Sequence, residues 1–156
     1  MSEINLRKMK DEDKESIIGL YSRFTEIDFM SWRNPEKMKE SQLELLQDAV
    51  ENLDMDSDIF VAEDKENNLL GFINITKTTD FFTGESQGYI SFVAVSKEAE
   101  GKGVAKKLMY VAEEWTKEKG YKQLTLNVFA KNERAVRLYS ALEYEAETMK
   151  MVKEVE

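Results

Sequence analysis

The chain of 156 residues contains neither cysteine nor histidine. Without cysteine it can form no disulfide and no thiolate nucleophile, and without histidine it cannot build a Ser-His-Asp or Cys-His catalytic arrangement. The same absences disfavour a transition-metal site, because these side chains are its usual ligands, and we expect no bound metal. Acid–base chemistry is therefore left to Asp, Glu, Lys, Tyr, a chain terminus or water.

Long apolar runs are also missing, since no stretch approaches the roughly 20 residues that a membrane-spanning helix needs. Met1 leads directly into polar residues, so we expect no secretory signal, no membrane partner and a cytoplasmic location. The sequence has a single proline and no break in composition. With 42% hydrophobic and 34% charged residues, it predicts one globular domain over residues 1–156.

Positive charge is scarce relative to negative charge, and the net charge is −9. This excess of acid argues against a nucleic-acid partner. Basic residues nevertheless gather locally, because residues 97–107 hold four lysines and two glutamates, a charge of +2. A locally positive segment in an acidic protein suits a phosphate ligand, although ordinary lysines on a helix surface would give the same pattern.

The hydrophobic periodicity predicts strands and helices in the order β-α-α-β-β-β-α-β-α-β. We expect strands near residues 4–9, 59–62, 69–75, 89–95, 124–128 and 148–151, and a loop over residues 78–88. We expect helices to begin after Asp11 or Asp13, at Pro35 with Asn34 as its cap, at Val104 with an end near Gly120, and close to Ala135.

The order of these elements indicates the fold class. A strand, helix, strand unit over residues 89–129 requires parallel neighbours with a right-handed crossover, whereas the earlier hairpin requires antiparallel ones. A mixed sheet covered by helices follows, which is an α/β (α+β) fold.

A glycine-bearing turn joins the strand at 89–95 to the helix that starts at Val104. It reads Glu100-Gly101-Lys102-Gly103-Val104-Ala105. Such a junction points several free backbone N–H groups at one place, where an anion can bind. The turn lacks the Gly-Lys-Ser/Thr of a phosphate-binding NTPase loop and the third glycine of a dinucleotide-binding fold. Taken alone, it is also compatible with an ordinary helix cap.

A second motif, Asn-Glu-Arg-Ala-Val-Arg-Leu-Tyr, begins at Asn132 and ends at Tyr139. Together with the turn, it resembles the acetyl-CoA-binding core of the GNAT superfamily of N-acetyltransferases, over about residues 89–151. The family pattern at the turn is Arg or Gln, two residues, Gly, one residue, then Gly or Ala. Gly103 and Ala105 match that pattern.

Two positions depart from the family. Glu100 stands where relatives have Arg or Gln, and Glu143-Tyr144 stands where they have Gly-Phe. Since Glu100 would be a like charge beside the expected anion, we expect it to weaken cofactor binding unless it points away.

The resemblance implies a mixed, largely antiparallel sheet flanked by helices, with acetyl-CoA as cosubstrate. The amides of residues 101–106 would hold its diphosphate, the strand end at residues 93–95 would pair with the pantetheine arm, and Asn132 would contact that arm. Tyr139 would protonate the departing thiolate, although an isolated tyrosine on this helix would more simply be a core aromatic. The implied cofactor-binding residues are Val93, Ala94, Val95, Gly101, Lys102, Gly103, Val104, Ala105, Lys106 and Asn132.

Direct attack of a primary amine on the thioester in a ternary complex is implied, because no cysteine is present to form an acyl-enzyme. The general base stays open. Many relatives have a glutamate on the strand that here contains Ser91, which cannot serve as a base. Acidic candidates are Glu85, Glu26 and Asp28, and water is an alternative.

The substrate would be selected by residues 24–32 and 78–88, where aromatic and acidic side chains suit an amine cation, although the aromatics would equally fit the core. A small-molecule amine and a protein amine are both open, and so is a homodimer.

Two other functions stay open. One is a non-catalytic acyl-CoA-binding sensor or regulatory module of the same fold, which the departures at Glu100 and Glu143 favour and which Asn132 and Tyr139 oppose. The other is a nucleotide-binding α/β domain, which the missing glycine and Ser/Thr partners oppose.

Overall fold

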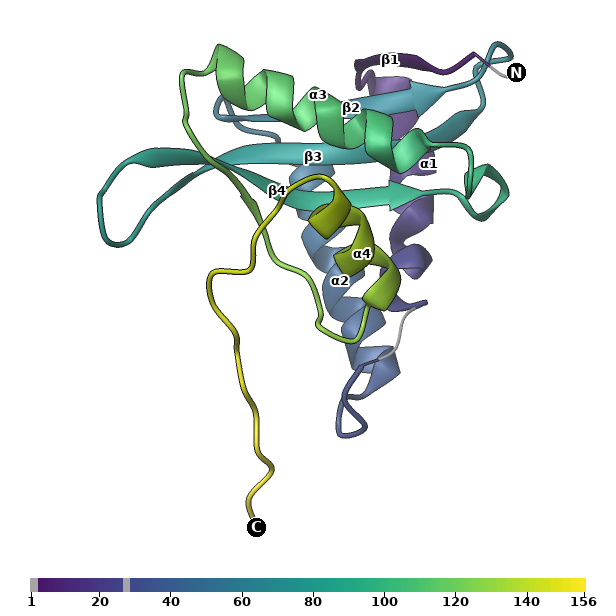
Figure 1. Ribbon diagram of the computed structural model, residues 1–156. Coiled ribbons are helices and arrows are strands. Elements are labelled where there is room, and N and C mark those ends of the chain that lie inside the picture. Colours follow the sequence, from purple (N-terminus) through teal and green to yellow (C-terminus); the bar gives the residue numbers. More distant parts are fainter. Residues whose placement is uncertain (1–2, 27–28) are drawn as a thin grey trace.

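A computed structural model describes residues 3–26 and 29–156 (Figure 1). Its strands are β1 (Asn5–Lys8), β2 (Ser57–Glu63), β3 (Leu69–Thr79), β4 (Ser86–Val95) and β5 (Leu124–Leu126). Its α-helices are α1 (Lys14–Ile18), α2 (Pro35–Glu51), α3 (Val104–Glu118) and α4 (Glu133–Ala141). Short 3-10 helices are η1 (Asp11–Asp13), η2 (Gly19–Thr25) and η3 (Lys97–Ala99).

The strands form a sheet in the order β1-β2-β3-β4-β5. Neighbouring strands are antiparallel except β4 and β5, which are parallel and are connected through α3. This confirms the predicted mixed, largely antiparallel sheet flanked by helices. The hairpin of β2 and β3 and the parallel pair around α3 both form as the sequence predicts.

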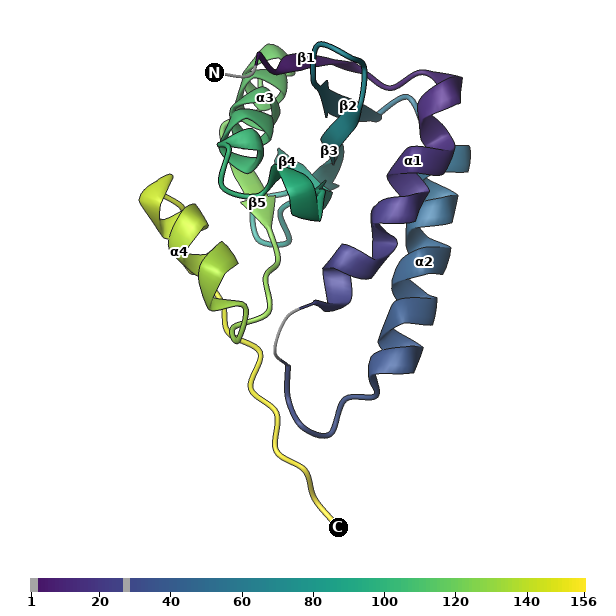
Figure 2. The same ribbon diagram turned by 90° about the vertical axis from the view of Figure 1, so that its right-hand side faces the viewer.

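Helices cover both faces of the sheet (Figure 2). Phe72 and Ile73 are successive residues of β3, so their side chains point to opposite faces. Ile73 packs with Leu108 of α3, whereas Phe72 packs with Leu46 and Val50 of α2. Each of these side chains is fully buried or nearly so. Burying one of them contributes roughly 1.5–3 kcal/mol, and the two clusters together fix the helices on the sheet.

Helix starts follow local side-chain chemistry. At α2 the Asn34 side chain accepts hydrogen bonds from the N–H groups of Glu36 and Lys37, at 3.0 and 3.2 Å, and Pro35 takes the first turn as predicted. The predicted first helix is instead divided into η1, α1 and η2. Asp13 directly precedes α1, but its side chain does not cap that helix. The side chain instead accepts a hydrogen bond from the Lys10 N–H at 2.7 Å.

Two sequence predictions about strands are wrong. The loop predicted over residues 78–88 is shorter than expected, because the β3–β4 ladder continues to the Thr79–Ser86 pair and leaves only residues 80–85 as the connection. The strand predicted at residues 148–151 does not form, since residues 145–156 are exposed and have no regular structure. Alternation of side chains is not sufficient for a strand, which needs a neighbouring backbone to pair with.

Over residues 3–26 and 29–156, each helix is too short or too polar to span a membrane.

Candidate active site

The strands β4 and β5 form a fork. β5 pairs with β4 only from Gly88 to Ile90, opposite Leu124 to Leu126. Beyond that point β4 continues to Val95 and pairs on its other side with β3. Residues 91–95 therefore present one backbone edge that has no strand partner among the described residues. An open edge of this kind can pair with an extended ligand that carries amide groups.

A β-bulge lies where the fork opens. Asn74 of β3 pairs with Phe92 and Ile75 pairs with Ile90, so Ser91 is an extra residue in β4. A bulge bends its strand and increases the local twist, which separates the end of β4 from β5. At the same place the Tyr89 hydroxyl accepts a hydrogen bond from Asn127 Nδ2 at 3.1 Å. Sequence reasoning did not single out this pair.

The glycine turn follows the open edge and leads into α3. Gly101 and Gly103 both have φ of +78°, the left-handed conformation that glycine adopts readily. The Lys107 N–H donates to the Gly103 carbonyl at 3.2 Å. The amides of residues 104–106 precede this bond and lack the partner that later helix residues have.

The start of α3 is unusual for a helix without a ligand. In the described part of the chain no side chain caps it, its first turn contains no acid, and Lys106 and Lys107 lie there instead. Cations at a helix N-terminus oppose the helix dipole, whereas an anion would be favoured by roughly 0.3–1 kcal/mol. A bound phosphate would accept hydrogen bonds from the uncapped N–H groups and would pair with the lysines of the first turn. This terminus therefore fits the predicted diphosphate site.

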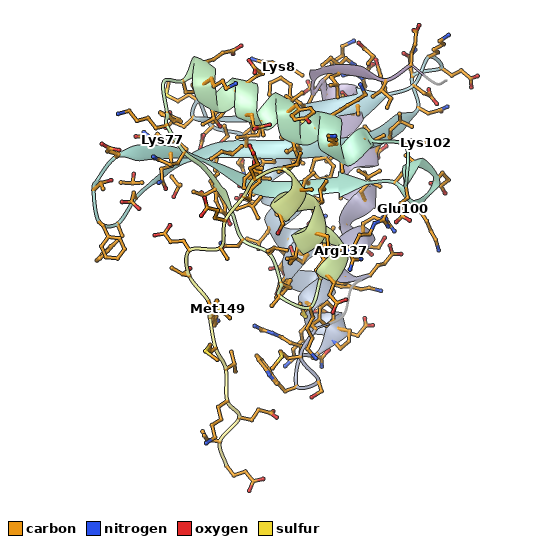
Figure 3. All side chains as sticks on the ribbon, in the orientation of Figure 1. Lys8, Lys77, Glu100, Lys102, Arg137 and Met149 are labelled. Carbon is orange, nitrogen blue, oxygen red and sulfur yellow. The ribbon has the colours of Figure 1, made fainter. Side chains whose placement is uncertain are left out.

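Glu100 lies between two arginines from distant parts of the chain. Arg23 of η2 binds its Oε1 through Nη2, and Arg134 Nη1 of α4 lies 3.3 Å from its Oε2. Figure 3 shows Glu100 near the turn that carries Lys102 and near α4 with Arg137. Hydrogen bonding to Arg23, and then to Arg134, lowers the pKa of Glu100 below its usual value. The carboxylate is therefore ionised but neutralised, and it is not the isolated like charge that the sequence suggested.

Arg23 also reaches the open edge of β4. Its Nε donates to the Val95 carbonyl at 2.9 Å, and its Nη1 binds Glu26. One side chain thus joins η2, the end of β4 and the glycine turn. Sequence reasoning missed both Arg23 and Arg134. The signal available was the charge reversal at Glu100, which requires compensating cations nearby.

Asn132 begins α4 as its cap. Its Oδ1 accepts the Ala135 N–H at 3.3 Å. No hydrogen bond within the described residues uses its side-chain NH2 group, which can still donate to a ligand. Asn132 therefore has a structural role that is compatible with the predicted contact to the pantetheine arm.

Tyr139 lies on α4 and packs against Tyr144, with ring centroids 5.9 Å apart at an interplanar angle of 61°. Both rings pack at the margin of the core beneath α3. Burial raises the pKa of Tyr139 above its usual value, so the hydroxyl is protonated at neutral pH. This is the state that a proton donor needs, and it is equally the state of a packed aromatic.

The segments predicted to select the substrate separate in the structure. Phe24 packs on Phe92 with centroids 5.2 Å apart and belongs to the core. Phe81 and Phe82 are 92% and 81% exposed at the tip of the β3–β4 hairpin, away from α4 (Figure 1). By contrast, Phe29 meets Phe129 at 6.1 Å, edge to face. That contact joins the segment before α2 to the segment between β5 and α4.

The candidate bases are not brought together with Tyr139. Glu26 is paired with Arg23 and is 46% exposed. Glu85 lies on the hairpin tip, and Asp28 lies outside the described residues. Ser91 forms the bulge. Within the described residues no group of three or more acids is arranged to hold a metal ion.

The sheet forks at β4, and the open edge of β4 leads to a glycine-bearing helix start. The match of the sequence to a protein family agrees with this geometry. Residues 21–144 match the family described as the Acetyltransferase (GNAT) family. The chain belongs to the GNAT family of acetyltransferases. A search of curated proteins gives no match.

Solved structures of GNAT proteins superpose over nearly the whole chain. A protein from Pyrococcus furiosus described as a candidate acetyl transferase is 29% identical, with a TM-score of 0.78, over 98% of this chain and 100% of that one. Ribosomal-protein-alanine N-acetyltransferase from Brucella melitensis is 20% identical, with a TM-score of 0.68, over 98% and 99%. Aminoglycoside N-acetyltransferase AAC(6')-Iy, in complex with CoA, is 19% identical, with a TM-score of 0.69, over 100% and 96%. The last two likenesses show the GNAT fold.

Proposed function

We propose that this protein is an N-acetyltransferase that moves an acetyl group from acetyl-CoA to a primary amine in a ternary complex. The observation that carries the proposal is that the open edge of β4 is followed, after η3 and the glycine turn, by the uncapped start of α3. The first offers a backbone to a ligand that contains amides, and the second offers N–H groups to a phosphate. CoA has both parts in one molecule, in this order. The CoA complex of the structural neighbour AAC(6')-Iy supports the same ligand.

The residues on the two elements fit that ligand. The amides of residues 101–106 would hold the diphosphate, with Lys102 and Lys106 adding positive charge. Val93, Ala94 and Val95 would pair with the pantetheine arm, and the free NH2 group of Asn132 would donate to it. Arg23 already occupies the Val95 carbonyl, so less of the edge is available there than the sequence predicts.

The bound thioester supplies an activated acetyl group. In the proposed mechanism the Tyr139 hydroxyl donates its proton to the sulfur that leaves, and a backbone N–H near Val95 polarises the carbonyl oxygen. The thiol has a pKa near 8.5 and tyrosine one near 10, so the transfer is uphill and hydrogen bonding carries much of the stabilisation. Water removes the amine proton, because the acidic candidates lie elsewhere or are paired.

The proposed amine site lies where Phe29 meets Phe129, beside the fork. Aromatic faces attract a cationic amine, and the net charge of −9 favours its approach. Before it attacks, the ammonium group loses one proton to water. When the amide forms, the nitrogen loses a second proton, and the Tyr139 oxygen regains one through water.

A thiol-release assay with acetyl-CoA and a panel of amines tests the function. The panel contains polyamines, aminoglycosides and peptides with a free N-terminus. We expect amine-dependent release of CoA and a product whose mass is increased by one acetyl group. Binding of CoA without turnover on any amine would favour the sensor module instead, and tighter binding of ATP than of CoA would favour the nucleotide-binding domain.

A further inference from the structure

The hairpin of β3 and β4 projects beyond the rest of the sheet. β2 begins opposite Thr76, and β5 pairs with β4 only from Gly88 onward. Residues 78–79 therefore pair only with residues 86–87, and this two-stranded ribbon has no further strand partner among the described residues. The pair of Lys77 and Gly88 marks the base of the ribbon. Figure 1 shows the ribbon reaching out at the left of the molecule.

The tip of the ribbon presents two phenylalanines to solvent. Phe81 and Phe82 are 92% and 81% exposed, and their rings meet edge to face with centroids 5.4 Å apart. The backbone beneath them forms a closed turn, because the Asp80 N–H donates to the Glu85 carbonyl and the Gly84 N–H donates to the Asp80 carbonyl, each at 2.9 Å. The turn holds both rings outward in the free protein, which lowers the entropy that a partner must overcome on binding.

Further exposed apolar surface lies at the same end of the molecule. Met55, on the loop before β2, is 92% exposed. The neighbouring Asp56 carboxylate lies 3.7 Å from Nζ of Lys77, which is labelled at the base of the ribbon in Figure 3. Met55, Phe81 and Phe82 together form the hairpin patch. Large apolar side chains that are exposed at one end of a protein indicate a surface that a partner covers.

Opposite charges lie at the tip and at the base of the ribbon. Residues 78–87 hold two acids and no base, a charge of −2, whereas residues 117–122 hold three lysines and one glutamate, a charge of +2. The basic segment lies at the base, because the Gly88 N–H donates to the Gln123 carbonyl at 3.0 Å. Each copy of the chain therefore carries an acidic tip and a basic segment, which complement each other across a two-fold axis.

Length and area both fit a contact between two copies. At a strand rise of about 3.3 Å per residue, residues 77–82 span roughly 15 Å. Two ribbons that lie side by side in opposite directions thus bring the tip of each to the base of the other. The four phenylalanines would bury roughly 500–900 Å², about half of the area in a stable interface of about 1,200–2,000 Å². Polar residues around an apolar centre supply the rest of such an interface.

We propose that the hairpin patch forms the interface of a two-fold dimer, in which the tip of each copy packs on residues 117–122 of the other. The contact is made by side chains. The open edge and the glycine turn lie at the opposite end of β4, so both copies keep an accessible candidate cofactor site. The dimer is independent of the proposed function and is tested without any ligand.

The first test is the mass of the full chain in solution, measured by light scattering during size exclusion. We expect a dimer that Phe81→Ser with Phe82→Ser converts to a folded monomer, as circular dichroism would verify. Leu45→Ser is the control, because Leu45 is 60% exposed on α2 and its loss should leave the dimer intact. A parent that is monomeric at every concentration, or a dimer that the two serines do not change, would overturn the proposal.

A second test addresses the charges. Glu85→Lys places a cation against the lysines of the other copy, and we expect it to raise the dissociation constant of the dimer at least about tenfold. Glu98→Lys makes the same change in net charge on η3, beyond the opposite end of β4, and should leave the dissociation constant as in the parent. Equal effects of the two substitutions would show that net charge acts rather than this contact.

A third test uses the absence of cysteine from the chain. One variant carries Thr83→Cys at the tip, which keeps both phenylalanines, and another carries Lys119→Cys or Lys122→Cys. After the variants are mixed and oxidised, we expect a disulfide-linked dimer that contains one chain of each kind. Leu45→Cys in place of the lysine substitution should give no such product. Linkage of Thr83→Cys only to itself, or no linkage at all, would contradict the packing of tip on base.

Discussion

Arg134 on α4 places its Nη1 3.3 Å from Oε2 of Glu100, on the turn that precedes α3. Arg23 binds the other carboxylate oxygen and also donates to the Val95 carbonyl. Glu100 therefore links the helix that carries Tyr139, the proposed diphosphate turn and the end of the open edge. Glu100, which departs from the family pattern, thus joins the parts of the candidate site through its ion pairs with Arg23 and Arg134.

Glu100→Gln should tighten the binding of CoA. The amide keeps a hydrogen-bond acceptor for Arg23 but removes a negative charge beside the diphosphate, and it leaves Arg134 free to face the phosphates. Because exposed charge contacts are weak, we expect the dissociation constant to fall at most about fivefold, and less at high salt. Titration calorimetry at low and high ionic strength measures this. Equal affinities for variant and parent at both salt concentrations would show that the ligand does not sense the charge.

Gly103→Ala should weaken CoA binding more than Gly101→Ala does. Both glycines have φ of +78° and open space where a Cβ would lie, so each substitution should cost a similar roughly 1–2 kcal/mol of stability. The family pattern requires glycine only at the position of Gly103, where the proposed diphosphate approaches the backbone. We expect at least about a tenfold loss of affinity at Gly103, since a Cβ there costs on the order of a hydrogen bond. Thermal unfolding and calorimetry on both variants separate strain from binding, and an equal loss of affinity in the two would leave the turn as a simple helix cap.

Arg7→Met should lower the free energy of unfolding at neutral pH, and it should make that free energy fall less steeply in acid. Arg7 binds Asp13 at 2.7 Å and Glu63 at 2.9 Å, and these hydrogen bonds lower the pKa of both carboxyl groups. Groups with a lowered folded pKa stabilise the protein above their unfolded values, near 3.9 and 4.3, and that stability disappears as pH falls through the folded values. We expect the variant to lose about 1–3 kcal/mol at neutral pH and to show a flatter decline below about pH 4.

The matched control for Arg7 is Lys8→Met. Lys8 is labelled in Figure 3, and its side chain is 68% exposed and 3.6 Å from Asp58. An exposed pair of this kind contributes roughly 0–1 kcal/mol, so the acid limb of a urea-unfolding series should stay as in the parent. If Lys8→Met and Arg7→Met behave alike, net charge rather than the Arg7 network sets the acid stability.

Tyr144→Phe should raise stability. The Tyr144 hydroxyl is buried and has no hydrogen-bond partner within the described residues, and burial is the main reason that its pKa is raised. Removing an unsatisfied buried hydroxyl should gain about 1 kcal/mol in the free energy of unfolding, because its desolvation is no longer uncompensated. Chemical denaturation measures this, and a loss of similar size would show that the hydroxyl has a partner such as a bound water.

Features encoded by adjacent residues could be predicted from the sequence. Asn34 and Pro35 mark the start of α2, and the two glycines mark the turn before α3, because capping and left-handed backbone need particular residues at particular positions. The order of elements followed from hydrophobic periods and gave the mixed sheet. These signals are local, and the structure confirms the two helix starts and the mixed sheet, whereas the final strand of the predicted order does not form.

Features that depend on distant partners could not be predicted. Arg23 and Glu100 are 77 positions apart, and no periodicity reports which long polar side chains will meet. Residues 148–151 show the opposite case, since Met149 and Met151 alternate with Thr148 and Lys150 but the segment pairs with no strand among the described residues. The base for the amine stayed unassigned for the same reason, because the acids named from the sequence are paired, distant or outside the described residues.

The catalytic role of Tyr139 is tested most directly by comparing Tyr139→Phe with Tyr144→Phe in steady-state acetyl transfer to the best amine of the panel. The two rings are neighbours and each variant loses one hydroxyl. The proposed mechanism predicts that Tyr139→Phe lowers kcat about 100-fold with little change in KM for acetyl-CoA, while Tyr144→Phe keeps the parent rate. Because burial raises the pKa of Tyr139, the parent should retain the activity that depends on this proton up to about pH 10. Equal kcat values for Tyr139→Phe and the parent across that pH range would contradict the mechanism and leave Tyr139 as a packed core residue.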